Sequence, residues 1–360
     1  MLAAIALQNF IAYSVNMADN IMLGSYGQVS LSGAATVNQI FFIIQQIMIS
    51  IAEITVMIGS QYWGRNELSP IRKLAGIALK TTAVFSVIIF LLCLVIPEYL
   101  LRIFTSDEAI ILEGMSYLRI IKYSFVLFMF STCLLGALRT VEVVQIAFRV
   151  SIVTLIINVG INWILIFGNL GAPRMGIVGA GAGTLIARIV EFLVILIYVW
   201  KVDKKLCLFS ERIFQKDARL SKDFAKAAVV MIPAEFCWAI ATPFQSAMLG
   251  AMSADAIAAN SIATTFYNYL KVIIRAIAST SAVLIGSAIG AGDLEEVKAK
   301  GRTISVICIV IGGILGLLLL LLLGPLLSLY SLTPEAMSLT SQMIALYAVI
   351  MVGMSYQMPV

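Results

Sequence analysis

The 360-residue chain is 61% hydrophobic and only 12% charged, and its mean hydropathy is +1.03. Because a soluble domain carries about 25% charged residues, this composition excludes a soluble globular protein and predicts an all-α polytopic membrane protein. The net charge of +5 comes from residues in the connections between apolar runs, so it indicates membrane orientation and not nucleic-acid binding.

The chain contains no histidine, which removes the commonest metal ligand and the usual proton shuttle at neutral pH. Its five cysteines form no C-x-x-C pair, and no Gly-Lys pair of a phosphate-binding loop occurs. We therefore expect no metal, no cofactor and no enzymatic activity. Any binding and release of protons must therefore use aspartate or glutamate carboxylates.

Apolar runs long enough to cross about 30 Å of hydrocarbon predict ten membrane-spanning helices. The predicted runs are 1–24, 32–60, 74–97, 114–138, 142–168, 176–200, 224–250, 256–288, 302–323 and 337–360. The first run has no preceding loop and the last ends with the chain, so we expect a chain that is shortened at both ends.

Lysine and arginine set the predicted orientation. Most of them follow the second, fourth, sixth and eighth runs, and the densest stretch extends from Lys201 to Lys226. The opposite side is assigned Arg102, Arg119, Lys122 and Arg174. The even-numbered connections and the N-terminus are therefore predicted to be cytoplasmic, in a multi-pass protein of the plasma membrane.

The two halves of the chain resemble each other at a fixed offset. Gly24 and Gly250 are 226 residues apart, as are Gly64 and Gly290, and Glu67-Leu68 matches Asp293-Leu294 at the same distance. Because this offset spans six predicted helices, an even number, the halves form a parallel repeat with a pseudo-two-fold axis along the membrane normal.

The repeat predicts two six-helix lobes with about ten of twelve helices present. The N-terminal lobe covers 1–202, a solvated cytoplasmic linker covers 203–223, and an incomplete C-terminal lobe of four helices covers 224–360. Residues 1–134 should superpose on 227–360.

Asp19 lies near the end of the first run. A lone aspartate in hydrocarbon costs about 2.5–3.5 kcal/mol on insertion scales, so such a residue faces a partner, a cavity or a moving ion. Asn158 and Asn162 are four residues apart and share a helix face, and Thr184 opens the polar edge of the next helix. These amides also fit simple hydrogen bonds between helices, and that alternative stays open.

Other charged residues fall within predicted helices. Glu53 and Glu235 are acidic, and Lys271 and Arg275 form a basic pair four residues apart that suits a cavity wall. Pro233, two residues before Glu235, predicts a break that exposes backbone carbonyls. Arg188 and Glu191 are predicted to pair with each other.

In the order and spacing of its motifs, the chain resembles the multidrug and toxic compound extrusion (MATE) family. The segments that carry the resemblance are Asp19-Asn-Ile-Met-Leu-Gly24, Gln61-Tyr-Trp-Gly-Arg65, Gly136-x-x-Arg139, Glu235-x-x-Trp238 and Ile289-Gly-Ala-Gly-Asp293. The similarity extends over essentially the whole chain.

The resemblance implies a twelve-helix antiporter that expels organic cations and drugs in exchange for protons or sodium. The family's ion site in the first lobe is matched by Asp19, Asn158 and Thr184. Asn162 stands where the family has an aspartate, so one carboxylate is missing. We expect a monomer in the lipid bilayer, with a small-molecule cation as its substrate.

Two alternatives remain at this point. A lipid-linked oligosaccharide flippase of the same superfamily would use Lys271 and Arg275 to bind a pyrophosphate, and a shortened chain could be a non-functional fragment. The sequence identifies neither the substrate nor the coupling ion.

Overall fold

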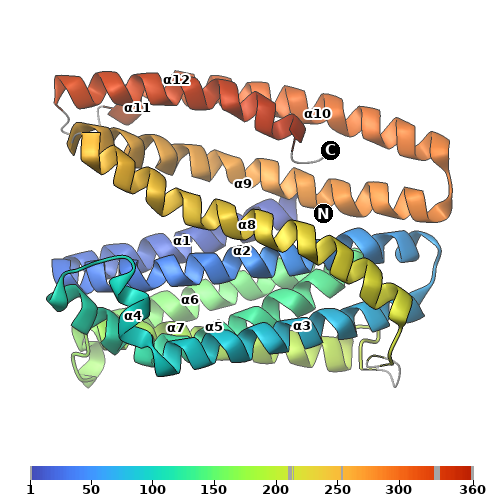
Figure 1. The fold of residues 1–360 in the computed structure, drawn as a ribbon, viewed down its shortest axis with the longest axis horizontal. Helices are drawn as coiled ribbons and strands as arrows, with labels where there is room; N and C mark the ends of the chain where they lie inside the picture. Colours follow the sequence, from blue (N-terminus) through green and yellow to red (C-terminus); the bar gives the residue numbers. More distant parts are fainter. Residues whose placement is uncertain (1, 210–212, 214, 253, 328–332, 358–360) are drawn as a thin grey trace.

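The computed structural model describes residues 2–209, 213, 215–252, 254–327 and 333–357, in which ten long helices account for most of the chain (Figure 1). The ten are α1 (Leu2–Tyr26), α2 (Gln28–Gly64), α3 (Leu68–Val95), α5 (Glu108–Thr140), α6 (Gln145–Phe167), α7 (Ile177–Ile197), α8 (Ala218–Met252), α9 (Ala254–Ala291), α10 (Leu294–Leu321) and α12 (Pro334–Gln357). Four short turns of helix join them: α4 (Pro97–Arg102), η1 (Asn169–Gly171), η2 (Tyr198–Val202) and α11 (Leu323–Leu327).

Each predicted run corresponds to one long helix, so the prediction of an all-α polytopic membrane protein is confirmed. Nine of the helices in the described part of the chain are long and apolar enough to cross a membrane. The helix that does not qualify is α1, which carries Asn9, Asn16, Asp19 and Asn20. One of them, Asp19, belongs to the site described below.

The predicted break at Pro233 is wrong, because α8 continues through it from Ala218 to Met252. Proline removes one N–H and frees the carbonyl four residues earlier. That carbonyl belongs to Val229, and a proline within a membrane helix is tolerated where neighbouring groups satisfy the carbonyl that it frees.

Aspartates begin several helices by accepting backbone N–H groups, as capping residues do. Asp107 Oδ1 accepts from Ala109 N at 2.9 Å before α5, and Asp293 Oδ1 accepts from Glu296 N at 2.9 Å before α10. Before α8, the N–H of Leu220 donates to the Asp217 carboxylate, and this hydrogen bond, with help from Lys73, lowers the pKa of that carboxyl.

The helix bounds repeat at the predicted offset of 226. Helices α3 and α10 begin at Leu68 and Leu294, and end at Val95 and Leu321. Helices α2 and α9 begin at 28 and 254, α4 and α11 at 97 and 323, and α5 and α12 at 108 and 334. The parallel repeat is therefore confirmed over these four pairs of helices.

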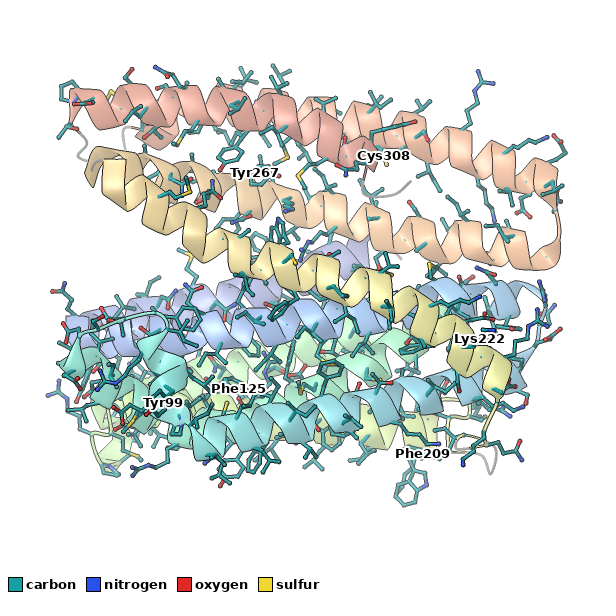
Figure 2. All side chains as sticks on the ribbon, viewed as in Figure 1. Tyr99, Phe125, Phe209, Lys222, Tyr267 and Cys308 are labelled. Carbon is teal, nitrogen blue, oxygen red and sulfur yellow. The ribbon has the colours of Figure 1, made fainter. Side chains whose placement is uncertain are left out.

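Figure 1 shows the two lobes one above the other, with α1–α7 below and α9–α12 above, while α8 crosses the front from one to the other. Phe125 lies inside the lower bundle and Tyr267 between α9 and α12 (Figure 2). The lobe boundaries at 202 and 224 stay predictions.

The linker differs from its prediction in one respect. Its segment before α8 includes residues 210–212 and 214, which lie outside the described part of the chain, but Leu206, Leu208 and Ile213 are buried against α3 and the ends of α5 and α7. The Asp203 carboxylate accepts N–H groups from Lys205, Leu206 and Cys207 and so folds a compact turn. A wholly solvated linker is therefore the wrong description.

The lobes touch most closely where α2 and α9 end, and we call this contact the α2–α9 seam (Ser60, Gln61 and Gly64 with Gly286, Ser287 and Gly290). A Cβ on Gly64 would lie 1.8 Å from the Ser287 carbonyl oxygen, and one on Gly290 would lie 1.8 Å from that of Gln61. The offset of 226 relates Gly64 to Gly290 and Gln61 to Ser287, so the two contacts are equivalent in the repeat. The seam therefore lies on the pseudo-two-fold axis, and the glycines allow the two backbones to touch.

Polar contacts continue the seam toward the membrane interior. Arg139 Nη1 lies 2.9 Å from Glu53 Oε1 and donates to Ser279 Oγ at 2.7 Å, and Ser279 Oγ donates to Glu53 at 3.3 Å. Glu53 and Ser279 are again 226 residues apart. Gly136 makes this possible, because a Cβ there would lie 2.9 Å from the Ala52 Cβ, so α5 approaches α2 closely.

Replacing Gly290 with valine should force the seam open. We expect overpacking to cost about 1–3 kcal/mol in the free energy of unfolding and to lengthen the distance between spin labels at positions 67 and 295. The control is Gly301→Val in α10, where nothing lies within 4 Å of the added Cβ. Unchanged label distances in the Gly290 variant would show that the seam does not hold the lobes together.

Candidate functional site

A chain of hydrogen bonds joins Asp19 on α1 to α6 and α7. Asn162 Nδ2 donates to Asp19 Oδ1 at 2.6 Å and is 3.3 Å from Asn158 Oδ1, and Asn158 Nδ2 donates to Thr184 Oγ1 at 3.1 Å. The four residues predicted from the sequence are thus brought together, and we call them the Asp19 site. The two asparagines share a face because they are one turn apart on α6.

The two asparagines are buried, with 1% of Asn158 and 0% of Asn162 exposed, whereas Asp19 and Thr184 are half-buried. Gly183 provides the space for Asn162, because a Cβ at position 183 would lie 2.0 Å from Asn162 Oδ1. Gly179 allows the same close approach one turn earlier, against the backbone of Leu165. The glycine-rich start of α7 therefore lets α6 and α7 pack closely together.

One oxygen of the site lacks a donor. Asn162 Oδ1 is buried and has no hydrogen-bond partner among the described residues, a situation that costs about 1–3 kcal/mol in a native protein. The Asp19 carboxylate, the two amide oxygens and the Thr184 hydroxyl together form a set of hard oxygen ligands with one negative charge. Such a set suits a proton on the carboxylate or a small hard cation.

A cavity of about 50 Å³ leads to the site between α1, α6 and α7. Its lining includes Asn158 and Thr184 at one end, and Arg188 and Glu191 along α7. Arg188 Nη1 lies 2.5 Å from Glu191 Oε2, so the predicted pairing of these two residues is confirmed. The volume is sufficient for one or two water molecules or a small ion.

Tyr117 is a neighbour that the sequence did not indicate. It is buried on α5, and its ring lies against α7, where a Cβ on Gly181 would be 3.2 Å from it. No spacing rule could have connected it to residues on α1 and α7, since only the packing of α5 against α7 brings it there.

No group of three or more His, Cys, Asp or Glu side chains that could hold a metal ion occurs among the described residues. In the Asp19 site, Asp19 is the one carboxylate, and the other three residues are neutral.

The second group of predicted residues does not form one site. Glu53 pairs with Arg139 at the seam, whereas Glu235 Oε2 accepts from Gln46 Nε2 at 3.0 Å and so joins α8 to α2. Lys271 Nζ lies 4.8 Å from the Trp238 ring centroid. Glu235, Lys271 and Arg275 influence one another electrostatically, but among the described residues neither base forms an ion pair.

A family model described as MatE matches residues 4–164 and 232–360. The chain is 26% identical over 332 residues to a probable multidrug resistance protein, NorM, of Halalkalibacterium halodurans, covering 89% of this chain and 70% of that protein. It is 23% identical over 325 residues to the probable multidrug resistance protein YoeA of Bacillus subtilis, covering 87% and 69%.

Solved structures with the same fold include a MOP superfamily transporter from Pyrococcus furiosus, described as having a binding pocket of reverse polarity (TM-score 0.88, 17% identity, 99% of this chain and 79% of that one). Another is a multidrug resistance MATE family transporter in an outward-facing conformation (TM-score 0.85, 19% identity, 99% and 80%). At these identities the likeness establishes the fold alone.

Gly183→Ala tests how tightly the site is packed. The added methyl group must displace Asn162, so we expect a loss of about 1–3 kcal/mol in unfolding free energy, measured by denaturant titration in micelles. Gly160→Ala is the matched control on α6, where nothing lies within 4 Å of the added Cβ and the higher helix propensity of alanine should stabilise by up to about 1 kcal/mol. Equal stability of both variants would contradict the packing described here.

Proposed function

Because the chain belongs to the MatE family of membrane transporters, we propose that it is a secondary active antiporter that exports amphipathic organic compounds, organic cations and drugs among them, in exchange for protons or sodium ions. The observation that carries this proposal is the Asp19 site, in which one carboxylate inside a helix bundle is bonded to neutral polar groups. The relatives from Halalkalibacterium halodurans and Bacillus subtilis, named as probable multidrug resistance proteins, support the choice of substrate.

Coupling depends on the single negative charge of Asp19. Burial among apolar helices disfavours the charged carboxylate, while the Asn162 amide favours it by donating a hydrogen bond. A proton or a sodium ion that reaches Asp19 through the α1–α6–α7 cavity neutralises this charge. The donor-free Asn162 Oδ1 offers the ion a further oxygen. The site would thus alternate between an empty charged form and an occupied neutral form.

Alternating access requires that only one side be open at a time. The α2–α9 seam closes one end of the lobe interface by direct backbone contact. By the lysine and arginine distribution, this is the cytoplasmic end. The geometry therefore supports a state that is closed toward the cytoplasm. A plasma-membrane location, a cytoplasmic N-terminus and a monomeric state belong to the same proposal.

Asp19→Asn should leave the fold intact, because the amide is nearly isosteric, yet abolish gradient-driven export. Asn162→Asp should strengthen sodium dependence by adding a second negative charge. Dye transport into everted vesicles, under an imposed pH gradient and then under a sodium gradient, measures both effects. Asp107→Asn, which alters an exposed capping carboxylate, is the control. If Asp19→Asn transports as well as the parent under both gradients, Asp19 has only a structural role.

A second candidate function rests on Lys271 and Arg275. The Glu235 carboxylate accepts from Gln46, and Lys271 lies on the Trp238 and Tyr267 rings. Within the described part of the chain neither base forms an ion pair, and such a basic pair suits an anionic substrate such as a lipid-linked pyrophosphate. This is the flippase alternative, and one basic pair supports it less than the Asp19 site supports antiport.

Transport assays distinguish the two functions. In proteoliposomes we expect export of a cationic dye and no translocation of a fluorescent lipid-linked sugar. Lys271→Met should leave dye export within about threefold of the parent, because the antiport mechanism does not use this ammonium group. The flippase would be favoured if the parent translocates the sugar lipid but exports no dye, and if Lys271→Met loses the translocation.

A further inference from the structure

An apolar groove lies on the side of the N-terminal lobe away from the Asp19 site. It has a volume of about 620 Å³ between α3, α5 and α7. Its lining comprises Ser86, Val87, Phe90, Leu91, Tyr123, Val126, Leu127, Leu185 and Ile189. Ligand pockets typically have volumes of about 300–1,000 Å³ and apolar walls with a few polar groups, so this groove has the size and character of a binding site.

Lys122 is not one of the lining residues, but its ammonium lies beside two of them, Phe90 and Tyr123. Lys122 Nζ is 5.7 Å from the ring centroid of Phe90 and 5.5 Å from that of Tyr123, and the two rings are 5.5 Å from each other. Only 7% of Lys122 is exposed, and in the described part of the chain it forms no ion pair or hydrogen bond. Two ring faces stabilise a cation only partly, by about 0.5–2 kcal/mol each.

The depth of Lys122 restricts the kind of anion that can reach it. The lysine and arginine distribution predicts an outward position for Lys122, but this residue lies two residues from Ser124, the midpoint of the 33-residue α5. At 1.5 Å per residue, the ammonium is near the centre of a hydrocarbon layer about 30 Å thick. A phospholipid phosphate stays at the bilayer surface, whereas a carboxylic acid enters hydrocarbon in its neutral form.

We propose that this groove binds a lipophilic monocarboxylic acid taken up from the bilayer, with its chain along the apolar lining and its acid group at Lys122. The acid arrives neutral and transfers its proton to the amine, or meets the ammonium as a carboxylate, so that both charges are paired. Volume, apolar walls and one unpaired base together define this ligand class, and none of them depends on the Asp19 site.

The groove and the Asp19 site share the same turns of α7. Leu185 and Ile189 line the groove, and Thr184 and Arg188, the residues that directly precede them, face the ion cavity. A ligand in the groove therefore packs against the back of the helix that carries part of the ion site. This places the acid where it can influence ion binding.

The test uses the full chain in phosphatidylcholine nanodiscs and titrates dansylaminoundecanoic acid, with its methyl ester as the probe that lacks the acid group. We expect saturable dansyl fluorescence with the acid but not with the ester. Lys122→Met should weaken binding at least about tenfold, and Lys122→Arg should retain it. Val126→Trp keeps the lysine and fills the groove, so it should also abolish binding.

Lys271 provides the matched control. It is similarly buried, with 6% exposed, and lies on two aromatic rings, those of Trp238 and Tyr267, but it does not adjoin the groove. Lys271→Met should therefore bind the acid like the parent. Equal signals from acid and ester, or undiminished binding in both Lys122→Met and Val126→Trp, would overturn the proposal. If the acid-binding proposal fails in this way but dye export persists, the proposed antiport function is unaffected.

Discussion

The hydrogen bond from Asn162 to Asp19 is the contact on which the organisation of the N-terminal lobe depends. A carboxylate among apolar helices must be paired, hydrated or neutralised. Here an amide from α6 meets it at 2.6 Å, and a second amide and a hydroxyl extend the network to α7. The glycines of α7 provide the space for this network, because any side chain at Gly183 would collide with Asn162. The asparagines of α6 and the glycines of α7 look unrelated in the sequence, but together they accommodate the Asp19 carboxylate.

Helix α1 links this charge to the opposite lobe. Its Asp19 face contacts α6, and another face carries Phe10, Tyr13 and Met17, which meet Tyr269 of α9. Helix α9 in turn ends at the seam with α2. A change of charge at Asp19 that shifts α1 therefore has a continuous packed route to the lobe interface. We therefore expect ion binding at Asp19 and opening of the α2–α9 seam to be coupled through α1 and α9.

Much of this arrangement could be predicted from the sequence because it depends on local pattern. Apolar run length indicates the ten helices, the offset of 226 gives the repeat, and the four-residue spacing places Asn158 and Asn162 on one face. The continuity of α8 through Pro233 was missed, because a membrane helix tolerates a proline where neighbouring groups satisfy the freed carbonyl, and the sequence alone does not show those neighbours. Tyr117, the groove at Lys122 and the seam contacts depend on which helices pack together, and spacing along one helix contains no such information.

The protonation state of Asp19 is the quantity that tests this account most directly. Infrared difference spectra of the purified protein, with its aspartates labelled with carbon-13, report each change in carboxyl charge. We predict that adding sodium ions or raising the pH removes the C=O stretch of one protonated aspartic acid, and that Asp19→Asn lacks this change while its fold is retained. A spectrum of Asp19→Asn identical to that of the parent would contradict the assignment of Asp19 as the group that binds the coupling ion.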